Sequence, residues 1–202
     1  MLTLKKVAVT GGIASGKSSV CRIFRSCGAY VVNADEIVHQ LLSPSTVIGQ
    51  QVIKLLGTEI VRDDQLDRKK IAKKVFLDSQ KLQALENLLH PAVLNEIEKV
   101  YRQIKDSKTY ALFVAEIPLL YESESEKFYD AVIAVISEPE NCKNRFQEAT
   151  GYSSIEYERR MERQMHPEVK AAKANYVIIN NGTFEELKEK ALKIYTTLHT
   201  TV

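Results

Sequence analysis

Five short apolar runs, rich in β-branched residues, recur along the chain and are separated by segments with the spacing of amphipathic helices. They lie at residues 6–10, 30–34, 110–117, 131–136 and 176–180. Most are almost continuously apolar, which is typical of strands covered on both faces, as in a parallel sheet. Because helical segments separate the runs, right-handed crossover connections are expected. The sequence therefore predicts an α/β fold around a five-stranded parallel sheet.

The connection between the second and third runs is too long for one crossover helix. It is predicted to form helices at 36–42, about 47–56, 68–77 and 79–106. Pro91 lies inside the last of these and predicts a kink or break there. A second helical stretch, 139–174, is rich in Arg, Lys and Glu and contains Gly151 as a candidate hinge.

The last predicted helix has a start signal. Thr183, followed by Glu186 three residues later, forms a capping-box pattern directly after Gly182. Apolar residues then recur on one face through Leu198. The chain is therefore expected to end in an amphipathic helix.

Composition limits the possible partners and compartments. The 28 basic and 26 acidic residues give a net charge of +2, which offers no general case for nucleic-acid or membrane-surface binding. No apolar run approaches the ~20 residues that a membrane span needs, and the N-terminus lacks the order of a signal peptide. The three cysteines show neither a CxxC pair nor zinc spacing. We expect a cytoplasmic protein with reduced thiols and no implied nucleic-acid, membrane or protein partner.

A glycine cluster follows the first apolar run, in the stretch VAVTGGIASGKSSVCRIF at 7–24. Gly11, Gly16, Lys17 and Ser18 fit G-x-x-x-x-G-K-[ST] between a predicted strand and a predicted helix, as this motif requires. Glycines let backbone N–H groups wrap a phosphate, and the helix N-terminus adds partial positive charge. Lys17 is suited to the β and γ phosphates, and Ser18 offers a hydroxyl to Mg²⁺.

The cluster therefore predicts a binding site for ATP with Mg²⁺. We expect the contacts to come from the loop and the first residues of the helix that follows. These residues are Gly11, Gly12, Ile13, Ala14, Ser15, Gly16, Lys17, Ser18 and Ser19.

Three classes of protein use this loop, and the rest of the chain favours one of them. A switch GTPase would need an N-K-x-D motif, which is absent. A mechanical ATPase would usually show an acidic pair after a later strand, whereas Glu116 stands alone before Pro118. Glu116 is expected to face the magnesium ion, through a water molecule. A small-molecule kinase needs an acceptor site and mobile cations, which the long insertion and the segment 139–174 can supply.

Six segments carry a resemblance to a known family: TGGIASGKS, NADEIVHQL, DRKKIAKKVF, LLHPAV, EIPLLYE and YVIINNGT. Over nearly its whole length the sequence resembles the dephospho-CoA kinase family. The resemblance implies a P-loop NTPase three-layer fold and transfer of the ATP γ-phosphoryl group to the 3′-hydroxyl of the dephospho-CoA ribose. The products would be coenzyme A and ADP, in the last step of coenzyme A biosynthesis. The alternatives are another small-molecule or nucleoside monophosphate kinase and a non-kinase ATP-dependent switch protein.

With this resemblance, residues 1–202 are expected to form a single kinase domain. Its parts are a nucleotide core at about 1–45 and 107–202, a helical substrate insertion at about 46–106, and a lid at about 139–174 within the core.

The chain departs from the family's pattern at three places. The usual D-A-D after the second strand is N-A-D, so Asn33 replaces the first acid while Asp35 keeps the second. The lid usually carries two arginines four apart, and this chain has Arg145 but Ala149. The common D-N-x-G after the last strand begins with Ile179. These departures bear on two expected features of the site, namely the positive charge of the lid and the contacts with the adenine side of ATP.

The resemblance implies three catalytic residues, namely Asp35, Lys17 and Arg145. Asp35 follows the second strand, where ligands of open α/β folds bind, and its expected role is to orient or deprotonate the acceptor hydroxyl. The alternative is an N-cap for a helix that begins at Glu36. His39, one turn later, is expected either to touch the acceptor or to support Asp35.

Further residues are candidates for substrate and nucleotide contacts. Arg68 is expected to bind a substrate phosphate or to be a solvated helix-start residue, and His90 to contact substrate or to shape the Pro91 kink. Arg145 and Arg160 are candidate lid cations, with solvated surface arginines as the alternative. The acceptor candidates are Asp35, His39, Arg68, His90, Pro118, Leu119, Tyr121 and Glu122, although Leu119 and Leu120 also suit the core. Arg145 and Asn180 are the further candidates for ATP binding.

Overall fold

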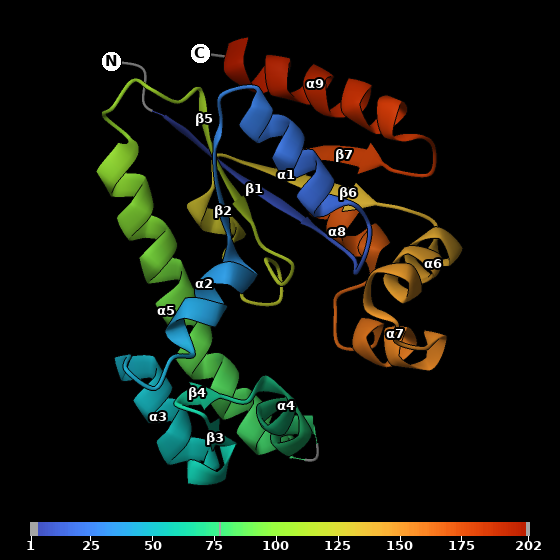
Figure 1. The fold of residues 1–202 in the computed structure, drawn as a ribbon. Helices are drawn as coiled ribbons and strands as arrows, with labels where there is room; N and C mark the ends of the chain where they lie inside the picture. The colour runs from blue at the N-terminus through green and yellow to red at the C-terminus, as the bar shows by residue number, and fades with distance from the viewer. Residues whose placement is uncertain (1–3, 77, 201–202) are drawn as a thin grey trace. The chain divides into compact units, whose positions relative to one another are not determined.

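A computed structural model describes residues 4–76 and 78–200 of the chain. Its main sheet has five parallel strands in the order β2-β5-β1-β6-β7 (Figure 1). The strands are β1 (Lys5–Gly11), β2 (Tyr30–Asn33), β5 (Leu112–Glu116), β6 (Ala131–Ile136) and β7 (Tyr176–Ile179). The predicted sheet is confirmed, and each strand overlaps the apolar run that predicted it.

One face of the sheet is covered by helices α1 (Lys17–Ser26) and α9 (Phe184–Thr200) (Figure 1). Val7 and Val9 of β1 point to this face and pack in one buried cluster with Phe24 and Leu187. Because side chains alternate along a strand, Ala8 and Thr10 point to the opposite face. Alternate side chains of β1 therefore face the helices on opposite sides of the sheet.

The opposite face is covered in part by α8 (Pro167–Lys173), which contacts β1 and β6. Tyr101 also packs on this side, with its ring centroid 5.2 Å from that of Phe113, and its hydroxyl donates to the carbonyl oxygen of Leu4 at 2.9 Å. With helices on both faces, the core has the three layers that the sequence predicted.

The predicted start of the last helix is confirmed. The Glu186 backbone N–H donates to the Thr183 hydroxyl oxygen at 3.3 Å, and α9 begins at Phe184. This bond satisfies one of the amide groups that a helix N-terminus leaves without a partner.

The segment predicted as a helical lid contains three helices. They are α6 (Pro139–Thr150), α7 (Ser154–Met161) and α8. Gly151 ends α6 in the left-handed conformation, with a φ of 71°. Its role as a hinge stays a prediction. Before this segment, a short 3₁₀ turn, η2 (Glu126–Phe128), leads into β6.

Residues 34–100 form a second compact unit, whereas 1–33 and 101–202 form the first. The second unit contains α2 (Ala34–Leu41), α3 (Val47–Leu56), η1 (Thr58–Ile60), β3 (Val61–Arg62), β4 (Gln65–Leu66), α4 (Arg68–Phe76) and most of α5 (Ser79–Ile104). Its core joins residues of α3, α4 and α5 with Ile60 and Leu66. The predicted insertion boundaries, about 46–106, stay a prediction.

The antiparallel pair β3–β4 was not predicted. Asp63 and Asp64 form its two-residue turn, with φ of 49° and 56°. Both angles are positive, as tight hairpin turns require, and Asp tolerates this conformation better than most residues. The two strands are too short to produce an alternating pattern in the sequence.

Of the kink or break predicted at Pro91, the break is wrong, because α5 continues through Pro91 as one helix. An internal proline costs about 3 kcal/mol through one lost hydrogen bond and a ring clash. Leu85, Val93 and Ile97, on both sides of the proline, are buried, and this burial favours one continuous element. Whether the helix is kinked there stays a prediction. Among residues 4–76 and 78–200, no helix is long and apolar enough to cross a membrane.

Ile133→Ala tests whether the central sheet carries the stability of the first unit. Ile133 is fully buried in β6, so the substitution is expected to lower the free energy of unfolding by about 2–5 kcal/mol. Ile155→Ala is the matched control, because Ile155 in α7 is 74% exposed and its change is expected to stay within about 0.5 kcal/mol. Urea unfolding of the three proteins measures both values. Similar losses in the two variants would contradict this assignment of the core.

Candidate active site

The loop between β1 and α1 has a backbone that only glycine accommodates at two positions. Gly11 has a φ of 145°, and a Cβ there would overlap the carbonyl oxygen of Val135. Gly16 has a φ of 106°, and its Cβ would overlap the side-chain amide of Asn180. The two glycines of the motif are therefore required by close neighbours as well as by positive φ.

Two polar contacts hold the loop in this shape. The buried ammonium of Lys17 donates to the carbonyl oxygen of Gly12 at 2.7 Å, across the loop. The side-chain amide of Asn180 donates to the carbonyl oxygen of Ser15 at 2.8 Å. Asn180 was predicted as an ATP contact, and the structure places its amide against the backbone of the phosphate loop.

A buried carboxylate stands beside the first turn of α1. The hydroxyl of Ser18 donates to Glu116 Oε1 at 2.6 Å, and the side-chain amide of Asn33 donates to Glu116 Oε2 at 3.0 Å. Asn33 is thus a neutral donor that holds Glu116 in place. Burial and the negative charge of Glu116 raise the pKa of the Cys21 thiol well above its ordinary value.

Arg145 lies at the base of the predicted lid. Its guanidinium donates to the carbonyl oxygen of Asn180 at 3.0 Å and to the hydroxyl of Ser137 at 3.3 Å. Asn181 accepts from the backbone N–H of Glu138 at 2.8 Å. These bonds join the start of α6 to the end of β7, next to the loop that Asn180 contacts.

Arg160 is placed differently from a solvated surface arginine. Its guanidinium lies over the rings of Phe146 and Tyr152, 5.5 and 5.0 Å from their centroids, and it pairs with Glu156 at 2.8 Å. These contacts are of the cation–π and i,i+4 ion-pair types. A part in phosphate binding stays a prediction, and it would require Arg160 to leave these partners.

A cavity of about 440 Å³ lies between the phosphate loop and helices α6 to α8. Gly12 and Ser15 line it from the loop, and Cys142, Tyr157 and Met161 line it from the lid segment. Burial, reinforced by the Cys142 thiol, raises the pKa of Tyr157 to about 12, so its hydroxyl stays protonated at neutral pH. The cavity therefore offers a largely apolar wall beside the loop.

The segment after β5 carries four of the predicted acceptor residues: Pro118, Leu119, Tyr121 and Glu122. Tyr121 is buried, whereas Pro118, Leu119 and Glu122 are half-buried. Leu120 is fully buried, which agrees with the core alternative for that residue.

The sequence did not single out Lys170, which contacts this segment, since a lysine in a charged helical stretch has the pattern of a surface residue.

Four other predicted residues lie in the second unit. Asp35 is the second residue of α2, which begins at Ala34, so the N-cap alternative is wrong as stated. Arg68 is exposed at the start of α4, and His90 is half-buried within α5. His39 is exposed and lines a cavity of about 290 Å³ in this unit. The binding and catalytic roles of these four residues stay predictions.

Comparison with known proteins agrees with the resemblance seen in the sequence. A family model described as dephospho-CoA kinase matches residues 5–186. The chain is 48% identical to a dephospho-CoA kinase of Protochlamydia amoebophila, over 96% of this chain and 97% of that protein.

Solved structures are similar over nearly the whole chain. A Thermus thermophilus protein is 30% identical with a TM-score of 0.84, covering 97% of this chain and 98% of its own. A dephospho-CoA kinase from Campylobacter jejuni is 27% identical with a TM-score of 0.70, covering 96% of each chain. The predicted fold class is confirmed.

Asn180→Asp tests whether the Asn180 amide maintains the phosphate loop. An aspartate cannot donate to the Ser15 carbonyl oxygen, so ATP affinity is expected to fall about tenfold or more, the scale of one lost buried hydrogen bond. Asn144→Asp adds the same charge at an exposed position of α6 and is expected to have a much smaller effect. Titration calorimetry with ATP measures both dissociation constants. Equal weakening in the two variants would show that added charge, rather than the lost donor, is responsible.

Proposed function

The chain belongs to the dephospho-CoA kinase family, and we propose that it transfers the γ-phosphoryl group of ATP to the 3′-hydroxyl of the dephospho-CoA ribose. The products are coenzyme A and ADP, and the reaction is the last step of coenzyme A biosynthesis. The observation that carries the proposal is the phosphate loop with Lys17, Ser18 and Glu116 around it, at the carboxyl edge of the sheet. A cytoplasmic location and the absence of protein partners stay predictions.

In this proposal the loop binds the donor. Backbone N–H groups between Gly11 and Ser18 surround the phosphates, with the N-terminus of α1 directed at the same anion. The ammonium of Lys17 exchanges the Gly12 carbonyl oxygen for phosphate oxygens. Because phosphoryl transfer has a loose transition state, most of the catalysis is positioning and stabilisation of charge.

A magnesium ion fits the residues beside the loop. The hydroxyl of Ser18 and the carboxylate of Glu116 are adjacent oxygen donors, the type that Mg²⁺ prefers. We propose that Ser18 binds the ion and that Glu116 holds it through water. When bound, the ion neutralises charge on the β- and γ-phosphate oxygens. Asn33 keeps the Glu116 carboxylate oriented through its hydrogen bond to Oε2.

The acceptor's hydroxyl needs a carboxylate that orients it and takes its proton. We assign this role to Asp35, which is exposed in the first turn of α2. His39, Arg68, His90 and the segment 117–125 are the proposed acceptor contacts. Arg145 is the proposed cation of the lid, where cations stabilise the transferred phosphoryl group. A nucleoside monophosphate kinase is the alternative activity with the same donor site.

A coupled assay of ADP release tests the acceptor. ATP consumption is expected to depend on dephospho-CoA and to be slow with AMP or with no acceptor. Faster turnover with AMP would favour a nucleoside monophosphate kinase. Hydrolysis that does not respond to any acceptor would favour an ATP-dependent switch protein and would overturn the proposed function.

Asp35→Asn tests the proposed base. Asparagine keeps the shape of the side chain but cannot take the proton, so kcat is expected to fall about 10²-fold or more, with ATP affinity retained. Glu36→Gln removes one charge from the same turn and is the matched control, with kcat expected within a few-fold of the parent. Thermal melts of both variants are expected to be similar, because each removes one acidic group near a helix N-terminus. Equal kcat values in the two variants would place the base elsewhere, with Glu116 the next candidate.

A further inference from the structure

Lys170 in α8 is a lysine with 0% exposure. Lysine is almost never fully buried unless its charge is paired. Its partner is Glu122 in the segment after β5, whose side chain is 18% exposed, and the Lys170 ammonium lies 2.8 Å from Glu122 Oε1. A buried ion pair thus joins α8 to the segment on which four acceptor contacts are proposed.

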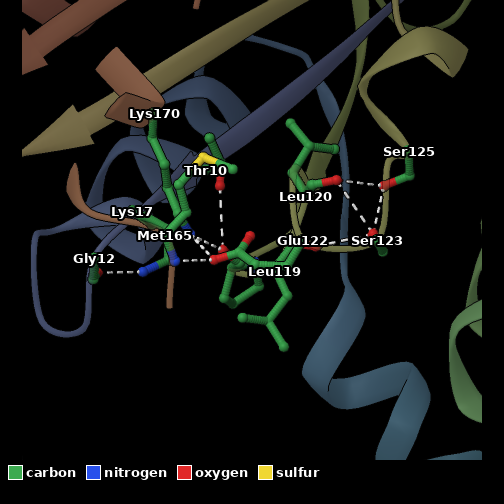
Figure 2. Close-up of polar contacts among 11 residues, drawn as sticks. Thr10, Gly12, Lys17, Leu119, Leu120, Glu122, Ser123, Ser125, Met165 and Lys170 are labelled. Atoms are coloured by element: carbon green, nitrogen blue, oxygen red, sulfur yellow. Dashed lines mark hydrogen bonds and ion pairs between the residues drawn. The ribbon is translucent and has the colours of Figure 1, made fainter. Parts of the chain in front are cut away.

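Figure 2 shows how the contacts of this lysine join three parts of the chain. The Lys170 ammonium also donates to the carbonyl oxygen of Pro118 at 2.7 Å. The same carbonyl accepts from the Thr10 hydroxyl at 3.3 Å, at the end of β1 just before the phosphate loop. Glu122 Oε1 accepts in addition from the backbone N–H of Met165 at 2.7 Å, where the chain enters α8. The end of β1, the segment 117–125 and the start of α8 therefore meet at one ammonium group.

The segment itself is braced by its own serines (Figure 2). The hydroxyl of Ser123 donates to the Leu119 carbonyl oxygen at 2.8 Å, and both the hydroxyl and the backbone N–H of Ser125 donate to the Leu120 carbonyl oxygen. Because these bonds lie within the segment, they hold its shape but not its place beside β1. That place is determined by the contacts of Lys170 and by two bonds to β1. These run from the Ile117 N–H to the Val9 carbonyl oxygen at 2.9 Å and from the Thr10 hydroxyl to the Pro118 carbonyl oxygen.

Stability alone explains this pair poorly. Removing two charges from water costs as much as their attraction returns, and apolar side chains of equal volume often serve as well. Glu122 Oε2 is also buried and accepts no hydrogen bond within the part of the chain that the structure describes. The pair does position groups relative to one another. The ammonium of Lys170 contacts both the Pro118 carbonyl oxygen and Glu122 Oε1, and so holds these two oxygens next to α8.

We infer that Lys170 is a positioning residue for phosphoryl transfer, which holds the acceptor-binding segment 117–125 at a fixed place relative to the phosphate loop. The inference rests on the proposed function, since it uses the acceptor contacts assigned above. In-line transfer requires the acceptor hydroxyl and the γ-phosphate to be held together, and a displacement of about 1 Å costs on the order of 10²-fold in rate. The bond from Met165 to Glu122 further ties the segment to the chain that returns from α7.

Lys170→Met is the first variant, because methionine fills similar volume without charge. The expected result is a fall of about 10- to 100-fold in kcat/KM for dephospho-CoA, with the dissociation constant for ATP changed by less than about threefold. ATP binding is spared because Lys17, Asn180 and the loop backbone keep their contacts. Lys188→Met, at an exposed position of α9, removes the same charge and is expected to leave both values unchanged.

The double variant Lys170→Met with Glu122→Gln separates positioning from folding. Removal of lysine alone leaves a buried unpaired carboxylate, so that variant is expected to melt at a lower temperature. Neutralising Glu122 relieves this, and the double variant is expected to regain most of its melting temperature. Its kcat/KM for dephospho-CoA is expected to stay low and below that of Glu122→Gln alone, which keeps the bond from Lys170 to the Pro118 carbonyl oxygen. Recovery of kcat/KM together with the melting temperature would overturn the inference, as would equal losses in ATP and acceptor binding.

Hydrogen exchange gives a readout that does not depend on activity. Amide exchange in peptides covering 117–125 is expected to be faster in the double variant than in the parent, with peptides of β6 unchanged. Unchanged exchange in 117–125 would overturn the inference. If the parent protein fails to phosphorylate dephospho-CoA, the proposed function fails, and the exchange experiment still decides whether Lys170 holds the segment.

Discussion

The close approach of neighbouring backbones at the end of β1 is the constraint on which the site depends. Gly11 lies against the carbonyl oxygen of Val135 in β6, with no space for a side chain. The chain leaves the sheet there in a conformation that L residues avoid, and it forms the loop that leads into α1. Because β1 lies between β5 and β6, the residues that end these strands, including Glu116, lie beside the loop. Strand order thus determines which side chains can meet a phosphate.

Those parts of the fold that depend on local pattern could be predicted from the sequence. The five strands follow from continuous apolar runs, and the start of α9 follows from Thr183 and Glu186. The loop was predictable because Gly11, Lys17 and Ser18 serve one chemistry within a few residues of one another. Asn180 was expected from resemblance, but its bond to Ser15 crosses most of the chain, and no local pattern encodes such a contact.

Other features could not be predicted because they depend on long-range packing. Lys170 resembles a surface lysine until α8 is packed against β1 and β6. Pro91 predicted a kink or break, and burial on both sides of it favours one helix over the break. The hairpin β3–β4 has strands of two residues each, too short for a periodic signal that would predict its turn at Asp63 and Asp64. For Lys170 and Pro91, tertiary packing outweighs a local preference.

The Cys21 thiol next to the Glu116 carboxylate has a consequence for the chemistry that the site can tolerate. Only the thiolate reacts readily with oxidants and alkylating agents, and both burial and the nearby negative charge keep this thiol protonated. The sulfur atom one turn along α1 from Lys17 therefore reacts slowly with such reagents. The helix that begins at the phosphate loop can therefore carry a cysteine without presenting a reactive thiolate there.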